Sequence, residues 1–133
     1  MKFNFTSQVC TSRSQSERLL ALGLKKQTAD CHYEGRKNKD EEWEVAVIGG
    51  CYRSYDFPAW SLHRLSEMMP DEIFYEDSTL ILGVFGDGVY YADNEYGEVF
   101  KSFDGNLYNC IIKCIKWLIK EGCFYKEYLE ERV

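Results

Sequence analysis

Six cysteines and two histidines are the residues of this chain whose types are most often used for metal binding and nucleophilic catalysis. The cysteines stand at positions 10, 31, 51, 110, 114 and 123. Structural zinc sites usually contain cysteine pairs with two to four residues between them. Only Cys110 and Cys114 have such a spacing, and His32 beside Cys31 does not complete a second pair. We therefore expect no metal, and we interpret the cysteines as buried core thiols.

A catalytic cysteine needs a histidine within hydrogen-bonding distance. Cys31 and His32 are neighbours in a segment, residues 29–34, that is compatible with a strand or a helix. Successive side chains of a strand point to opposite faces, so in a strand these two cannot serve each other. No nucleophile signature surrounds Cys51 either. We expect no catalytic residue, and a cysteine-dependent enzyme stays open as an alternative because the sequence does not say whether Cys31 or Cys51 is reactive.

Carboxylates and glycines occur in short clusters that also suggest possible sites. A calcium-binding loop needs the pattern D-x-[DN]-x-[DN]-G and a glutamate at its twelfth position, and residues 93–97 lack this pattern. Gly83, Gly86 and Gly88 do not form the G-x-G-x-x-G fingerprint of dinucleotide sites. We interpret the carboxylates as solvated turn residues and the glycines as a hairpin turn, and we expect no cofactor.

Residues 14–36 are the segment that suggests DNA binding. The segment can be interpreted as a helix, a turn at Gly23 and a second helix that would present Gln27, Thr28 and His32 to DNA. It is also locally basic. The chain as a whole carries 16 basic and 22 acidic residues, however, and its net charge of −6 disfavours a phosphate-binding protein. DNA binding is therefore an alternative, and nucleic acid is not the partner we expect.

Length and composition predict a single domain over residues 1–133. The chain is 45% hydrophobic and 29% charged, as is usual for a globular domain, and its 16% aromatic content argues against disorder. No repeat or linker divides it. The first 17 residues lack the apolar core of a secretory signal, and no stretch approaches the roughly 20 apolar residues of a membrane span. We expect a cytoplasmic protein with reduced thiols and no membrane partner.

The N-terminal half predicts two short helices and a strand. The first helix is expected over about residues 14–22, with Ser14 and Glu17 in a capping box and Gly23 as the left-handed residue that ends it.

Residues 35–42 are almost wholly polar and predict a loop, while residues 43–48 predict a strand. For the second helix, we expect Pro58 to introduce it, Ser61 to cap it and Pro70 to end it.

From about residue 72 to residue 103 the hydrophobic pattern changes to the period of two that is typical of strands. Four short runs separated by turn residues predict an antiparallel meander. Residues 80–85 are apolar on both faces and indicate a central strand. Gly86-Asp87-Gly88 predicts a hairpin turn, because these residues tolerate positive φ.

The C-terminal part predicts the longest helix. A narrow polar stripe spaced by four, three and four residues indicates a helix that is covered on most sides; it consists of Asn109, Lys113, Lys116 and Lys120. Residues from about 124 to 133 are expected to form a charged surface tail. The elements together predict an α+β fold, in which a C-terminal helix and two shorter helices pack on a mostly antiparallel sheet.

Three sequence motifs add a resemblance to this interpretation. They are Gln15-Ser16-x₂-Leu19-Leu20-x-Leu22-Gly23-Leu24, then Thr28-Ala29-Asp30, then Pro58-Ala59-Trp60-Ser61-Leu62-x₂-Leu65 with Met69-Pro70. Together they resemble small proteins of uncharacterised activity that are encoded in prophages and mobile elements of gut anaerobic bacteria. The resemblance covers residues 13–70, implies an accessory protein of a mobile element, and transfers no catalytic residue.

The sequence therefore predicts a non-enzymatic accessory protein that acts through protein–protein contacts. Abundant aromatic residues beside charges suit such contacts; the candidates are Tyr52, Tyr55, Tyr90, Tyr91 and Tyr96. A homodimer through a strand edge or the aromatic surface is also expected, because edge strands pair with other chains unless they are blocked. The identity of a host or phage partner and the oligomeric state stay open.

Overall fold

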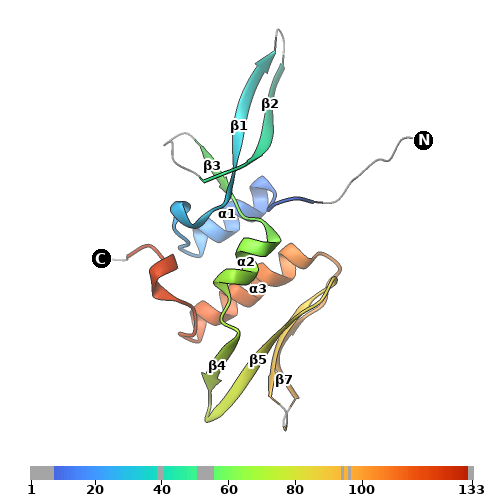
Figure 1. Cartoon of the computed structure of the whole chain (residues 1–133), viewed down its shortest axis with the longest axis vertical. Coiled ribbons are helices and arrows are strands. Elements are labelled where there is room, and N and C mark those ends of the chain that lie inside the picture. Colours follow the sequence, from blue (N-terminus) through green and yellow to red (C-terminus); the bar gives the residue numbers. More distant parts are fainter. Residues whose placement is uncertain (1–7, 39–40, 51–55, 94, 96, 132–133) are drawn as a thin grey trace, which may run out of the picture.

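The described residues form three α-helices and two antiparallel sheets, which is the α+β class expected from the sequence (Figure 1). The computed structural model describes residues 8–38, 41–50, 56–93, 95 and 97–131, with only the backbone described for 35–38 and 41–45. The helices are α1 (Arg13–Ala21), α2 (Leu62–Met68) and α3 (Leu107–Lys120), with short 3₁₀ helices η1 (Lys26–Thr28) and η2 (Lys126–Tyr128).

The two sheets extend from opposite sides of the helices (Figure 1). The three-stranded sheet has the order β2-β1-β3 and consists of β1 (Cys31–Asn38), β2 (Glu41–Ile48) and β3 (Phe57–Ala59). The four-stranded sheet has the order β4-β5-β6-β7 and consists of β4 (Glu72–Tyr75), β5 (Ser78–Val84), β6 (Val89–Asp93) and β7 (Gly97–Ser102). It is the meander predicted over residues 72–103.

Local turn chemistry explains how the meander reverses direction. Glu76 and Asp77 join β4 to β5 with positive φ values of 46° and 64°, which matches the twist of a two-residue hairpin. The hairpin turn predicted over residues 86–88 joins β5 to β6, although Gly86 and Gly88 do not adopt positive φ there. Gly88 instead permits close packing, since a Cβ there would lie 2.3 Å from the ring of Phe103.

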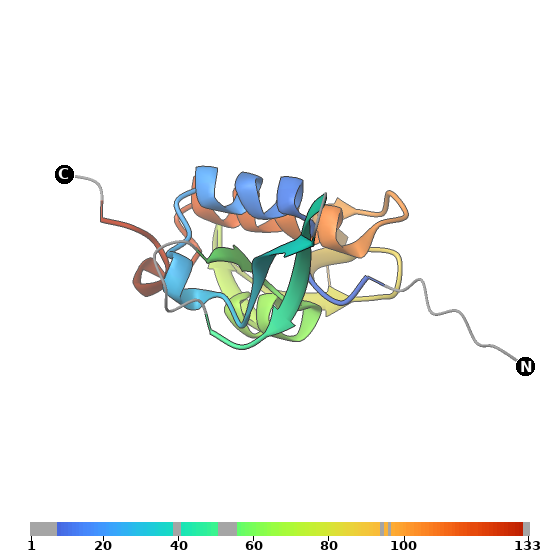
Figure 2. The ribbon, with the colours of Figure 1, turned by 90° about the horizontal axis from the view of Figure 1, so that it is seen from above.

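Helix α3 packs on one face of the four-stranded sheet, against β6 and β7. The Trp117 ring lies in the middle of this contact, with its centroid 5.3 Å from Phe100, 5.5 Å from Tyr75 and 5.8 Å from Tyr91. The three lysines of the predicted polar stripe are exposed on the other side of the helix. Helix α1 lies beside α3 (Figure 2). The prediction of which face of α3 is exposed and which sides are covered is thus confirmed.

The ends of α1 are only partly as predicted. Its cap is Ser12 rather than Ser14: the Ser12 hydroxyl accepts from the Gln15 amide at 3.1 Å, and the Gln15 side chain accepts from the Ser12 amide at 2.9 Å. Glutamine thus replaces glutamate in the capping box. The C-terminal end is confirmed, because Gly23 has φ of 103° and Leu24 donates back into the last turn at 3.2 Å.

The predicted loop over residues 35–42 is wrong. Strand β1 continues to Asn38 and β2 begins at Glu41, so residues 35–38 and 41–42 belong to a pair of long antiparallel strands that extends away from the helices (Figure 1). Residues 31–34 are strand. Pro58 lies in β3 opposite His32 and does not begin α2, although Ser61 caps α2 as expected. Strand β3 is an edge strand, where a proline is tolerated.

The segment expected to be a charged tail is held against the end of α1. Phe124 is buried. The Lys25 amide donates to the Tyr128 carbonyl at 2.8 Å, and the Glu130 amide donates to the Gly23 carbonyl at 2.7 Å. Backbone hydrogen bonds of this kind fix residues 124–131 in place, so they line a surface together with α1 and α3.

Candidate protein-docking surface

The face of the four-stranded sheet that is turned away from α3 carries exposed apolar side chains. In β4, Ile73 is buried whereas Phe74 is 73% exposed, and in β5 Leu80 is fully buried whereas Ile81 is 49% exposed. Because strand side chains alternate between faces, Phe74 and Ile81 belong to this outer face. Their exposure shows that the described chain leaves the outer face uncovered.

Cross-strand pairing orders the outer face into rows. Ile81 pairs with Glu72 on one side and Ala92 on the other, and Ala92 pairs with Glu98. Directly paired residues of a sheet point to the same face, so an apolar centre lies between two carboxylates. This row places Ile81 on β5, one of the two inner strands of the sheet.

The next row carries an aromatic cluster. Tyr90 pairs with Gly83, and its ring lies across that residue, since a Cβ at Gly83 would be 2.3 Å from the ring. The Phe85 ring stacks on Tyr90 with centroids 5.6 Å apart, and Phe103 lies 6.3 Å from Phe85. Phe85 and Phe103 are each about half exposed. We call the combined surface the docking face; it consists of Phe74, Ile81, Phe85, Tyr90 and Phe103.

Charge is strongly segregated onto the part of the chain that forms the docking face. Residues 71–104 contain nine acidic residues and one basic residue, Lys101, so the rest of the chain is slightly basic. Within this segment, hydrogen bonds from Lys113 and then from the Cys110 thiol lower the pKa of Asp104 to about 2. The segment carries a net charge of −8, and such an excess of negative charge repels anions and attracts cationic groups. The modest net charge of the whole chain conceals this local excess.

Four of the five described cysteines are buried, namely Cys10, Cys31, Cys110 and Cys114, whereas Cys123 is partly exposed. Cys31 is 3% exposed, and burial raises its pKa to about 12. Cys110 and Cys114 are fully buried on α3, and burial also raises the pKa of Cys114 to about 12. Thiolates form rarely at such values, so Cys31 is a poor nucleophile. Cys51 lies outside the described residues, and within them no three ligand-type side chains come together as a metal site.

The two histidines are engaged in local interactions. His32 is 7% exposed; its Nδ1 lies 3.1 Å from the Gly49 carbonyl oxygen and its Nε2 lies 2.9 Å from a Glu34 carboxylate oxygen. The hydrogen bond to Glu34 is the larger cause, and the hydrogen bond to Gly49 the second, of a pKa of His32 that is raised above its ordinary value. His63 is an exposed residue of α2, and its Nε2 lies 3.6 Å from the Glu67 carboxylate. The contacts of the two rings are thus with the Gly49 carbonyl and with the carboxylates of Glu34 and Glu67.

The helix–turn–helix prediction for residues 14–36 is wrong in its second helix. After Gly23 the chain forms the three-residue helix η1 and then strand β1. The Thr28 hydroxyl accepts from the indole N–H of Trp60 at 3.0 Å in the core, and His32 is buried on β1. The three residues expected to face DNA therefore do not lie on one helix: Gln27 and Thr28 belong to η1, and His32 belongs to β1.

Of the five tyrosines predicted to lie on an aromatic surface, the structure describes two, and it places them differently. Tyr90 lies on the docking face, whereas Tyr91 is fully buried and donates its hydroxyl to the Pro70 carbonyl at 2.6 Å. Tyr52, Tyr55 and Tyr96 lie outside the described residues. Sequence reasoning missed the exposed side chains of Phe74, Ile81, Phe85 and Phe103. Strict alternation from Ile73 and Leu80 would have identified the first two.

No protein-family model, curated protein or solved structure matches this chain. The docking face is therefore assigned from its own geometry and charge. Across the described part of the chain, no helix combines the length and the apolar character that crossing a bilayer requires.

Proposed function

We propose that this chain is a non-enzymatic accessory protein that binds another protein through the docking face. The partner's contact surface would combine apolar side chains with arginine or lysine. The observation that carries this proposal is an uncovered apolar sheet face within a segment that holds nine acidic residues and one basic residue.

The apolar side chains supply the main part of the binding free energy in this proposal. Phe74 and Ile81 are 73% and 49% exposed, so an occupant has area to cover on both. Full burial of such a side chain contributes about 1.5–3 kcal/mol. The preformed stack of Phe85 on Tyr90 loses little side-chain entropy on binding. An arginine of the partner fits this stack, because guanidinium groups pack on aromatic faces.

In this proposal the acidic residues orient the partner and increase the rate at which it associates. Glu72 and Glu98 stand at the two ends of the row that contains Ile81. Opposite charges at the edge of an interface increase the association rate and disfavour partners of like charge. Binding should therefore weaken as salt is added, because exposed charges are screened. An acidic protein or a nucleic acid is an unfavourable occupant for the same reason.

The test is a titration of the ¹⁵N-labelled full chain with two short synthetic peptides, one alternating arginine with leucine and one alternating glutamate with leucine. We expect amide shifts on β4, β5 and β6 with the arginine peptide and much smaller ones with the glutamate peptide. Equal responses to both peptides, or arginine-peptide shifts confined to the three-stranded sheet, would overturn the proposal.

A matched pair of variants locates the surface. Ile81→Ser removes an apolar side chain from the docking face, and Ile48→Ser makes the same change on β2, where Ile48 is 81% exposed. We expect Ile81→Ser to weaken binding of the arginine peptide at least fivefold and Ile48→Ser to leave it unchanged. Weaker binding by Ile48→Ser together with unchanged binding by Ile81→Ser would place the binding surface on the three-stranded sheet.

The setting of this function stays a prediction. The resemblance to prophage and mobile-element proteins directs the search for the partner to proteins encoded nearby in such an element, and a cytoplasmic location belongs to the same proposal. Both are tested by genome neighbourhood and by fractionation of the cells that make the protein.

A further inference from the structure

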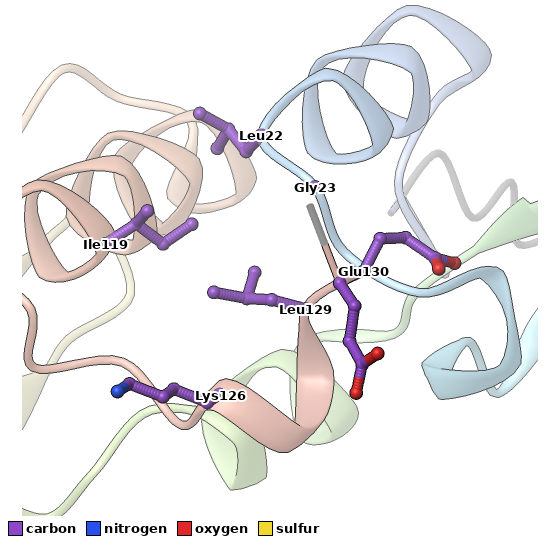
Figure 3. A pocket seen from close by; sticks show the side chains of 7 residues that line it. Leu22, Gly23, Ile119, Lys126, Leu129 and Glu130 are labelled. Atoms are coloured by element: carbon purple, nitrogen blue, oxygen red, sulfur yellow. The ribbon is translucent and has the colours of Figure 1, made fainter. Parts of the chain in front are cut away.

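A groove separate from the docking face runs along α1 and α3 to the C-terminal segment. One part of it, of about 360 Å³, lies between α1 and α3 and includes Leu22 and Ile112. The other part, of about 530 Å³, lies where Leu22, Ile119 and Leu129 meet (Figure 3). Because Leu22 lines both parts, we treat them as one feature, the helix groove, with an apolar floor.

The two ends of the helix groove carry opposite charges. Arg18, Lys113 and Lys116 line the part between the helices. Lys113 is already paired with Asp104 at 2.5 Å, which leaves Arg18 and Lys116 as the main basic groups.

Glu130 and Glu131 line the opposite end, where Lys126 offsets part of their charge. In Figure 3 the side chain of Leu129 extends toward Ile119. The helix groove is therefore apolar along its length, basic at one end and acidic at the other.

We propose that the helix groove is the interface through which two copies of this chain form a two-fold symmetric dimer. In a two-fold interface the same surface lies on both sides, and residues of one copy meet their counterparts in reverse order. The basic end of each groove would then face the acidic end of the other, and the apolar floors would cover each other. A groove with one sign of charge would repel its own copy, so the opposite signs favour a second copy as the occupant.

The proposal goes beyond the proposed function, because the dimer would leave the docking face of each copy open. It also assigns the homodimer expected from the sequence to a surface other than a strand edge or the aromatic residues.

The test is sedimentation velocity of the full chain and of two charge-reversal variants over a range of concentrations. Arg18→Glu/Lys116→Glu makes both ends acidic, and Glu130→Lys/Glu131→Lys makes both ends basic. We expect each variant alone to dimerise at least tenfold more weakly than the unaltered chain. A mixture of the two variants should recover dimers of one copy of each, because both charge contacts are then attractive again.

A control variant changes the charge by the same amount elsewhere. Glu72→Lys/Glu98→Lys lies in the row that contains Ile81 of the docking face, and we expect it to leave the dimer unchanged while it weakens binding of the arginine peptide. This separates failure of the dimer proposal from failure of the proposed function. Circular dichroism checks that each variant folds, and Glu130→Gln/Glu131→Gln replaces the lysine pair should that pair not fold.

Three outcomes would overturn the dimer proposal. The first is a chain that stays monomeric at all concentrations, and the second is a dimer that neither reversal weakens. The third is a mixture of the two reversed variants that dimerises no better than each variant alone.

Discussion

Removing one hydroxyl group from either of two adjacent tyrosines tests the assignment of the two sheet faces. Tyr91 is fully buried, and its hydroxyl donates to the Pro70 carbonyl at 2.6 Å. Tyr91→Phe keeps the ring against Trp117 but leaves a buried carbonyl without this donor, which costs about 1–3 kcal/mol. At roughly 3–5 °C per kcal/mol for a domain of this length, Tm should fall by roughly 3–15 °C.

The control is Tyr90→Phe, the same atom removed from the next residue. Tyr90 is half-buried on the docking face, and its ring keeps its contacts with Gly83 and Phe85 in the variant. Surface changes of this size usually alter the free energy of unfolding by less than about 0.5 kcal/mol. Urea unfolding of both variants, together with thermal melts, measures the difference between the two faces directly.

The pH dependence of the free energy of unfolding gives a second test of the buried position of Tyr91. Burial raises the pKa of Tyr91 above its ordinary value of 10.0. The folded state therefore holds this proton more tightly than the unfolded chain does, so the associated stability is present below about pH 10 and is lost as the pH rises further. Tyr91→Phe lacks this loss, and its deficit relative to the unaltered chain should shrink above pH 10. Equal effects of Tyr90→Phe and Tyr91→Phe on stability, or no effect of either, would refute the assignment of the faces.

Three further substitutions or probes test other parts of the structure. Gly88→Ala should destabilise by about 1–3 kcal/mol, because the new Cβ would lie 2.4 Å from the Ser102 carbonyl oxygen, whereas Gly86→Ala meets nothing within 4 Å and should be nearly neutral in urea unfolding. Ser12→Ala should lower the free energy of unfolding by about 1 kcal/mol and Ser14→Ala by much less, again measured by urea unfolding. A larger loss for Ser14→Ala than for Ser12→Ala would show that Ser14 caps α1. Cys31 should resist iodoacetamide at pH 8 in the folded protein and react after unfolding, as mass mapping of the labelled peptides will show, and rapid labelling of folded Cys31 would reopen the cysteine-dependent alternative.

Much of the fold is predictable because its signals are local. The meander follows from alternating side chains and from turn residues such as Glu76 and Asp77, which adopt the positive φ that a hairpin needs. Helix α3 follows from the spacing of its lysines, and Gly122, with φ of 73°, marks its end. Each of these signals depends on residues fewer than about ten positions apart in the sequence, so no tertiary information is required.

The errors concern segments whose structure depends on distant partners. Residues 35–42 are too polar to predict a strand, and residues 35–38 and 41–42 are strand only because β1 and β2 pair along their whole length. Pro58 suits a helix start, yet its segment pairs with β1 at the sheet edge. Ser14 and Ser12 are both adequate caps by residue type, and it is Ser12 that forms the capping box with Gln15.

The amino-acid sequence by itself determined that this protein is an α+β domain with a covered C-terminal helix, because periodicity and turn residues act over a few neighbours. Which tyrosine is core and which is surface was decided only in three dimensions, since a one-residue change of register exchanges the faces of a strand. Tyr91 lies beneath Trp117 because α3 covers that face, and Tyr90 faces outward for the same reason. The helix groove also exists only in the folded chain, where residues 18–22, 112–119 and 126–131 meet.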